Sequence, residues 1–260
     1  MECLEDNESA RTQAAFRGEP AARRDLIVCE PMGTLVAFDL DGTLIDSQRD
    51  LAESANRMLA TYGAGPLAID DVASMVGDGA RQLVVRALEA AGVQADDVSA
   101  LGRFVEIYSE HLVVHTRPYD GIPELLARLE GRAALAVLTN KPEGMSRRLL
   151  AVFGMTRFFP WVIGGDSPRF PRKPDAAGLR HLIESTGATP LTTVLVGDSM
   201  VDVTTARTAG AHVCAAGYGF GKLRQPLVLQ PGELLANRPG DLEGLLEPFW
   251  LRDKARTNPT

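Results

Sequence analysis

Short, continuous apolar runs that stop abruptly at polar residues or glycine are the feature that most restricts the fold of this 260-residue chain. Such a run is typical of a strand buried on both faces, as in a parallel sheet covered by helices. The first run ends at Asp39, and the next three end at Thr139, Gly164 and Gly197. We expect buried strands at residues 35–38, 135–138, 161–163, 194–196 and 212–215.

Helical apolar periodicity separates these runs. Residues 123–129 begin with a proline and are followed by Gly131, and two further helical patterns end before Gly154 and Gly187. Proline favours the first turn of a helix, and glycine favours the left-handed conformation that follows the last turn. Strands that alternate with helices predict the α/β fold class, with a doubly wound, Rossmann-like parallel sheet.

One segment interrupts this alternation directly after the first strand. Residues 47–117 show helical periodicity and no convincing strand. Ser47, with Asp50 three residues later, resembles a capping box that begins the first of these helices. We therefore expect an all-helical cap domain at 47–117, inserted into an α/β core made of residues 35–46 and 118–248.

Composition argues against several classes of function. The chain has 34 acidic and 27 basic residues, a net charge of −7 and no basic run, which disfavours binding to nucleic acid or a membrane surface. Residues 1–34 are acidic, lack the apolar segment of a targeting peptide, and are expected to form a flexible N-terminal extension; residues 249–260 are expected to form a tail. Three widely spaced cysteines without a CxxC pair favour a cytoplasmic protein without disulfides.

Polar side chains follow the expected strands at the edge where parallel sheets bind ligands. They are Asp39 and Asp41 after the first strand, Thr139 after the second, and Asp198 and Asp202 after the fourth. A single Asp-Gly after a strand is usually only a turn, but several acids at one edge would form an acidic pocket. Carboxylates this close cannot all remain ionised without a cation, and a site with only oxygen ligands favours Mg²⁺.

Four motifs, in this order along the chain, resemble those of the haloacid dehalogenase superfamily of phosphotransferases. They are Asp39-Leu40-Asp41-Gly42-Thr43, Thr139-Asn140-Lys141, Lys173-Pro174-Asp175 and Gly197-Asp198-Ser199-Met200-Val201-Asp202. Within the superfamily the chain is most similar to phosphoglycolate phosphatases, through residues 41–47, 77–80, 162–166 and 217–219. The resemblance implies an enzyme, namely a magnesium-dependent phosphatase that hydrolyses a small-molecule phosphate monoester. The substrate that the resemblance favours is 2-phosphoglycolate.

The resemblance also implies which acids perform the chemistry. Asp39 would be the nucleophile and form an aspartyl-phosphate, since a carboxylate needs no base to activate it. Asp41 would be the general acid–base, which protonates the leaving oxygen and then takes a proton from water. Magnesium would be held by the Asp39 carboxylate, the Asp41 backbone carbonyl and Asp198. Asp202 is expected just outside these ligands, as the partner of Lys173 or as a ligand through water.

The remaining motif residues would bind the phosphate. Thr139 would donate its hydroxyl, Asn140 its backbone N–H, and Lys173 would neutralise the phosphoryl oxygens. Lys141, the last residue of its motif, could either line the pocket or be exposed.

The cap loop at residues 77–81 is expected to read the substrate. Gly77 and Gly79 allow close backbone approach, and Arg81 could pair with a substrate carboxylate or be an exposed residue at a helix start. The histidines are expected to be structural or surface residues; they are His111, His115, His181 and His212.

Three alternatives remain at this point. The substrate could be a sugar or amino-sugar phosphate. The enzyme could be a phosphomutase of the same fold. In a different class, the chain could be a non-catalytic binding module, although the usual sign of one is the loss of a catalytic acid, and none is lost here.

Overall fold

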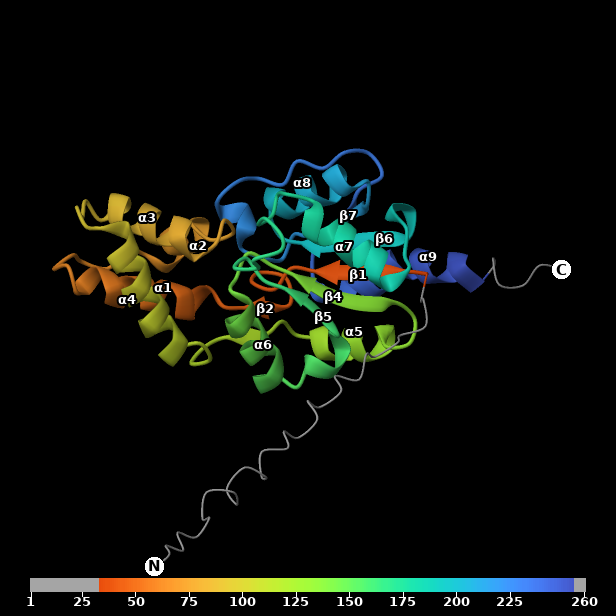
Figure 1. The fold of residues 1–260 in the computed structure, drawn as a ribbon, viewed down its shortest axis with the longest axis horizontal. Coiled ribbons are helices and arrows are strands. Elements are labelled where there is room, and N and C mark those ends of the chain that lie inside the picture. The colour runs from red at the N-terminus through yellow and green to blue at the C-terminus, as the bar shows by residue number, and fades with distance from the viewer. Residues whose placement is uncertain (1–32, 255–260) are drawn as a thin grey trace, which may run out of the picture. The chain divides into compact units, whose positions relative to one another are not determined.

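The computed structural model describes residues 33–254 and contains a six-stranded sheet in which every neighbouring pair of strands is parallel. The strand order is β5-β4-β1-β6-β7-β8 (Figure 1). Five of these strands confirm the apolar runs, whereas the sequence does not predict β8, a three-residue strand whose Leu235 is 43% exposed. The bounds are β1 Leu35–Phe38, β4 Ala134–Leu138, β5 Trp161–Ile163, β6 Thr193–Gly197, β7 His212–Ala216 and β8 Leu234–Ala236.

Helices cover both faces of the sheet, as the doubly wound fold class requires (Figure 1). Alternate residues of β1 belong to two different apolar clusters, because successive side chains of a strand point to opposite faces. Leu35 and Ala37 pack with α7 and α8, while Val36 and Phe38 pack with α5, α6 and α9. These helices are α5 Ile122–Leu129, α6 Glu143–Val152, α7 Ala177–Thr186, α8 Met200–Ala209 and α9 Leu242–Lys254.

Four helices lie between β2 and β3, as the helical periodicity of residues 47–117 predicts. They are α1 Gln48–Ala60, α2 Ile69–Ser74, α3 Ala80–Ala90 and α4 Asp97–Glu110. Two-residue strands flank this cap, β2 Ile45–Asp46 and β3 Arg117–Pro118, which pair antiparallel. These strands and the short α2 are too brief to leave a periodic signal. Four 3₁₀ turns complete the fold: η1 Thr156–Phe158, η2 Pro190–Thr192, η3 Gly221–Leu223 and η4 Pro239–Asp241.

The predicted capping box at the start of α1 is wrong. Ser47 occupies the N-cap position without capping the helix; its Oγ donates to Asp41 Oδ1 at 2.5 Å. Asp50 is 1% exposed and accepts the backbone N–H groups of His115 and Thr116 at 2.8–2.9 Å, together with the Thr116 hydroxyl at 2.7 Å. Both side chains therefore make long-range contacts, which compete with a local cap.

The predicted boundary of the C-terminal tail at residue 249 is also wrong, since α9 continues to Lys254. Phe249 explains the longer helix, because its buried ring packs edge-on against His212 and its carbonyl accepts the Thr34 hydroxyl. The expectation of a flexible extension at 1–34 falls almost wholly outside the described residues.

The single cysteine within the described part of the chain, Cys214, is a free, buried residue of β7. No helix within residues 33–254 combines the length and the hydropathy needed to cross a membrane.

Candidate active site

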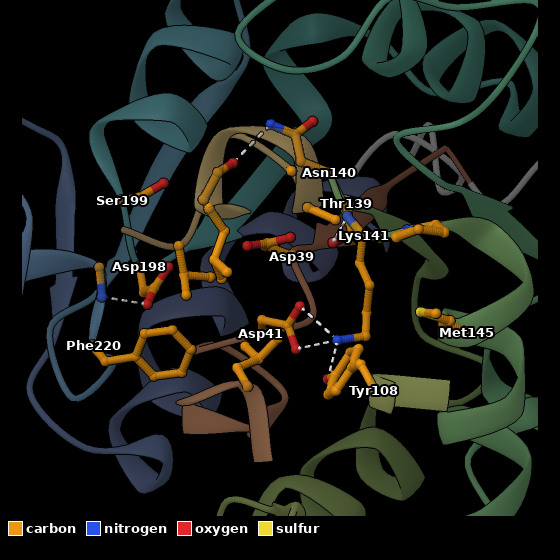
Figure 2. Close-up of a pocket in the computed structure, with 18 of the residues that line it drawn as sticks. Asp39, Asp41, Tyr108, Thr139, Asn140, Lys141, Met145, Asp198, Ser199 and Phe220 are labelled. Carbon is orange, nitrogen blue, oxygen red and sulfur yellow. Dashed lines mark hydrogen bonds and ion pairs between the residues drawn. The ribbon is translucent and has the colours of Figure 1, made fainter. Parts of the chain in front are cut away.

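The ends of three neighbouring strands bring the predicted polar residues together. β1 lies between β4 and β6, and the residues that follow or end these strands are Asp39, Thr139 and Asp198. All three are buried, with exposures of 8%, 4% and 4%. They line one cavity with Asp41, and Figure 2 shows their side chains around it. The structure thus brings the strand-end acids to a single edge of the sheet.

Lys173 lies among these acids. Its ammonium is 2.8 Å from Asp39 Oδ1 and 2.5 Å from Asp202 Oδ1, and its side chain is 3% exposed. The other Asp202 oxygen accepts the Ser199 hydroxyl at 2.7 Å. With both oxygens engaged, Asp202 positions Lys173, which is one of the two roles that the sequence leaves open for it.

Carboxylates outnumber the ammonium in this cluster, where oxygens of Asp39, Asp198 and Asp202 lie within 4.8 Å of one another. Burial raises the pKa of Asp39 to about 6; Lys173 opposes the shift and Asp202 adds to it. Burial, followed by the charges of Asp39 and Asp202, also raises the pKa of Asp198 well above its ordinary range. In this buried cluster, one ammonium does not neutralise the carboxylates, so Asp39 and Asp198 would be stabilised in their ionised forms by a further cation.

These residues fit a hard divalent cation. Asp39 Oδ1 is buried, and the ion pair with Lys173 at 2.8 Å is its one polar contact given among the described residues. An oxygen-only donor set that needs positive charge is the chemistry that Mg²⁺ satisfies. Asp39 and Asp198 are the side chains best placed to hold it, because Asp202 is already engaged.

Glycines make room for Asp198. Gly42 has a φ of +80°, and a Cβ at this residue would overlap the Asp198 carboxylate. A Cβ at Gly219 would overlap Asp198 as well, and the Gly221 N–H donates to Asp198 Oδ2 at 2.7 Å. Gly219, of the motif residues 217–219, therefore gives the Asp198 carboxylate its space, a role that the sequence does not reveal.

Asn140 joins the segment at Lys173 to the cap. Its side-chain amide donates to the carbonyls of Lys173 at 3.0 Å and Gly77 at 2.8 Å, and its Oδ1 accepts the Lys173 N–H at 2.9 Å. The expected role concerned only its backbone N–H. Thr139 Oγ1 accepts the Lys141 N–H at 3.3 Å and donates to none of the described residues, so its proton is available to a ligand.

The side chain of Lys141 is buried at 3% exposure, which resolves the choice that the sequence leaves open. Its ammonium donates to Asp41 Oδ1 at 3.0 Å and Oδ2 at 3.1 Å, and to the Tyr108 hydroxyl of α4 at 2.5 Å (Figure 2). Asp41 therefore lies between Ser47 and Lys141. Sequence reasoning misses Tyr108 entirely, because it reads as one more apolar residue of a helical stripe.

Of the cap residues predicted to contact the substrate, only the two glycines line the cavity. Gly77 and Gly79 line the cavity. Arg81 does not: its side chain is 55% exposed and pairs with Asp97 at 2.7 Å. The expectation that Arg81 meets a substrate carboxylate is therefore not supported, because the charge at the start of α4 holds it away from the cavity.

The cap side of the cavity is mainly apolar. The cap contributes the apolar side chains of Leu51, Val76, Ala80, Leu83, Phe104 and Val105, and the core extends this apolar wall with Met145 of α6 and Phe220 after β7. No histidine is among the lining residues. His181 stacks on Phe170 and His111 bonds to its own helix, in agreement with structural roles.

Comparison with known proteins identifies the family. A sequence model of the haloacid dehalogenase-like hydrolases matches residues 36–216. The chain belongs to the haloacid dehalogenase-like hydrolase family. Among its family relatives, phosphoglycolate phosphatase 1 of Pseudomonas aeruginosa is 38% identical over 80% of this chain and 78% of that protein. Phosphoglycolate phosphatase of Agrobacterium fabrum is 39% identical over 77% of this chain and 87% of that protein.

Solved structures agree with this family assignment. A predicted phosphoglycolate phosphatase from Haemophilus somnus superposes with a TM-score of 0.74 at 28% identity, over 82% of this chain and 98% of that one. The α/β fold class and the membership of this hydrolase family are thereby confirmed. The chain is an enzyme that resembles phosphoric monoester hydrolases over most of its length.

Proposed function

We propose that this chain is a magnesium-dependent phosphatase that hydrolyses 2-phosphoglycolate through an aspartyl-phosphate. The observation that carries the proposal is the placement of Asp39, with a carboxylate oxygen free of hydrogen bonds, between Lys173 and the acid Asp198. The names of the curated relatives support the choice of substrate.

The first half of the reaction needs a nucleophile and groups that bind and neutralise the phosphoryl oxygens. A carboxylate oxygen of Asp39 attacks phosphorus while the bond from phosphorus to the leaving oxygen breaks. Lys173 and the Thr139 hydroxyl hold the non-bridging phosphoryl oxygens, where charge is concentrated in the transition state. Bound Mg²⁺, held by Asp39 and Asp198, supplies positive charge that offsets the repulsion between the nucleophile and an anionic substrate.

The second half needs a single acid–base group. Asp41 protonates the leaving oxygen in the first step and takes a proton from water in the second, when water attacks the aspartyl-phosphate and releases inorganic phosphate. Asp41 is two residues from Asp39 and lines the same cavity. Ser47 and Lys141 fix its side chain by hydrogen bonds of 2.5–3.1 Å.

The apolar wall of the cavity, formed by cap and core residues, favours a small substrate over a sugar phosphate. Hydroxyl groups of a sugar would face Leu83, Phe104 and Phe220, where they would lose hydration without a hydrogen-bond partner. The same argument weakens a phosphomutase, which must hold a hexose on this wall. Retention of both catalytic acids weakens the non-catalytic alternative.

A panel of phosphate esters with and without Mg²⁺ tests the proposal. We expect the highest kcat/KM for 2-phosphoglycolate, no turnover after chelation, and a loss of at least about a thousandfold in Asp39→Asn. Asp71→Asn, on the exposed face of α2, is the matched control and should retain activity. Full turnover by Asp39→Asn would refute the mechanism, and conversion of a hexose 1-phosphate to its 6-phosphate isomer would identify a mutase.

A further inference from the structure

The apolar wall leaves one requirement of 2-phosphoglycolate unmet: its carboxylate needs a partner. An anion placed among apolar side chains without a hydrogen-bonding cation would be strongly disfavoured. Among the described residues that line the cavity, Lys141 alone has a cationic side chain. Arg81 is turned toward Asp97, and the ammonium of Lys173 is held by Asp39 and Asp202.

We propose that Lys141 and Tyr108 bind the carboxylate of the substrate, and that this pair makes the enzyme selective for phosphate esters of 2-hydroxy acids. This inference rests on the proposed function. It assigns to Lys141, a core residue, and to Tyr108, a cap residue, the recognition that the sequence assigns to Arg81.

The chemistry of the substrate sets where this partner must lie. In the phosphate ester of a 2-hydroxy acid, one carbon separates the leaving oxygen from the carboxylate. A group that binds the carboxylate must therefore lie next to the group that protonates the leaving oxygen. Lys141 meets this condition, because its ammonium is 3.0 Å from Asp41 Oδ1.

Both side chains have donors to offer. The Lys141 ammonium has three N–H groups; two are directed at the oxygens of Asp41 and the third at the Tyr108 hydroxyl. One of the two N–H groups on Asp41 can turn to a substrate carboxylate while the other stays on Asp41. The Tyr108 hydroxyl accepts from Lys141 and donates to no acceptor among the described residues. Its proton is therefore available for the second carboxylate oxygen.

The surroundings hold the pair in place. Tyr108 is 2% exposed, its ring stacks on Phe104 with centroids 5.6 Å apart, and the Lys141 ammonium lies 4.5 Å from the Tyr108 ring centroid. Buried, packed side chains lose little freedom when a ligand binds. Figure 2 shows the two side chains converging beside Asp41, with Met145 on the far side of Lys141.

The test compares 2-phosphoglycolate with ethyl phosphate, which replaces the carboxylate by a methyl group and keeps the ester. The quantity measured is the ratio of kcat/KM for the two esters with Mg²⁺. A charge-assisted hydrogen bond predicts that Lys141→Met lowers this ratio by about 10- to 150-fold, and that Lys141→Arg restores part of it. Tyr108→Phe, which keeps the ring, should lower the ratio by about tenfold.

Tyr62→Phe is the matched control, because this tyrosine lies in the cap, is exposed and does not line the cavity; its ratio should equal that of the wild type. If Lys141→Met and Tyr108→Phe lower both rates equally, the pair acts only through Asp41 and the inference is overturned. If Lys141→Met does not fold, Tyr108→Phe decides alone. A wild-type enzyme that hydrolyses neither ester would refute the proposed function itself, and equal rates for both would overturn the carboxylate site while leaving a phosphatase.

Discussion

Arg224 of the core and Asp78 of the cap form an ion pair of 2.5 Å that joins the segment after β7 to the loop between α2 and α3. Asp78 also pairs with Arg86 of α3 at 2.5 Å. Burial alone would raise the pKa of Asp78, but the hydrogen bonds from Arg224 and Arg86 hold it below its ordinary value. A lowered pKa means that the contact is fully formed at neutral pH and is lost only as the pH falls through that lowered pKa.

This pair predicts how the cap loop is held. Arg224→Gln should raise KM by up to about fivefold with a smaller change in kcat, because partly exposed ion pairs contribute about 1 kcal/mol or less. Added salt should weaken substrate binding by the wild type toward that of the variant. Arg238→Gln, which removes an 82% exposed partner of Asp241, is the control. An unchanged KM in Arg224→Gln would show that the loop is held by other contacts, such as the bond from Asn140 to Gly77.

Substitutions at two glycines can distinguish the effect of backbone strain from the effect of crowding against Asp198. Gly42 and Gly63 have φ values of +80° and +76°, but a Cβ at Gly63 meets nothing within 4 Å, whereas one at Gly42 would overlap Asp198. Alanine at either position should cost about 1–2 kcal/mol of unfolding free energy from strain. Only Gly42→Ala should also abolish Mg²⁺ binding, measured by calorimetry, and turnover. Normal Mg²⁺ affinity in Gly42→Ala would contradict the assignment of Asp198 as a metal ligand.

Stability should respond to pH and metal together. Because burial raises the pKa of Asp39 from 3.8 to about 6, its contribution to stability is complete below 3.8 and is lost as the pH rises through about 6. Mg²⁺ binds the ionised carboxylates, so it should raise Tm more at about pH 7.5 than at about pH 5. Thermal unfolding with Mg²⁺ or with chelator at the two pH values makes the measurement. Equal shifts in Tm would indicate that the ion does not bind to Asp39 and Asp198.

Asp50 should contribute strongly to stability although it does no chemistry. Its buried carboxylate accepts three donors from His115 and Thr116, where the chain returns from the cap. Asp50→Asn places an amide group against backbone N–H donors and should cost about 2–3 kcal/mol of unfolding free energy. Urea titration measures the loss, with Asp71→Asn as the exposed control. A loss below about 0.5 kcal/mol would show that solvent or a rearranged turn satisfies these donors.

Local patterns predict the part of the fold that local interactions determine. The run Leu35 to Phe38 predicts β1, because a strand buried on both faces must be apolar throughout. The proximity of Asp39 and Asp198 is also predictable, because each follows a buried strand and the carboxyl ends of neighbouring parallel strands lie at one edge of the sheet. The strands β2 and β3 leave no such pattern, because each has only two residues.

Long-range partners account for what the sequence does not predict. Lys141 and Asp41 are 100 residues apart in the chain, and nothing near either residue indicates that they pair. The sequence leaves the position of Arg81 open for the same reason, because its partner Asp97 belongs to the next long helix of the cap. Motif spacing identifies which residues reach the cavity, whereas the charges around each one decide where its side chain points.

The antiparallel pairing of Ile45 with Pro118 and of Asp46 with Arg117 has a consequence for how this protein could have been assembled. The inserted segment leaves and re-enters the core at adjacent backbone positions. Joining those positions directly would require only a tight turn, and the loop-closure cost of a longer insertion rises slowly with its length. One inserted segment could therefore be replaced by another during evolution. Such a replacement would change the residues that face the substrate and leave the register of the sheet and the spacing of its acids unchanged.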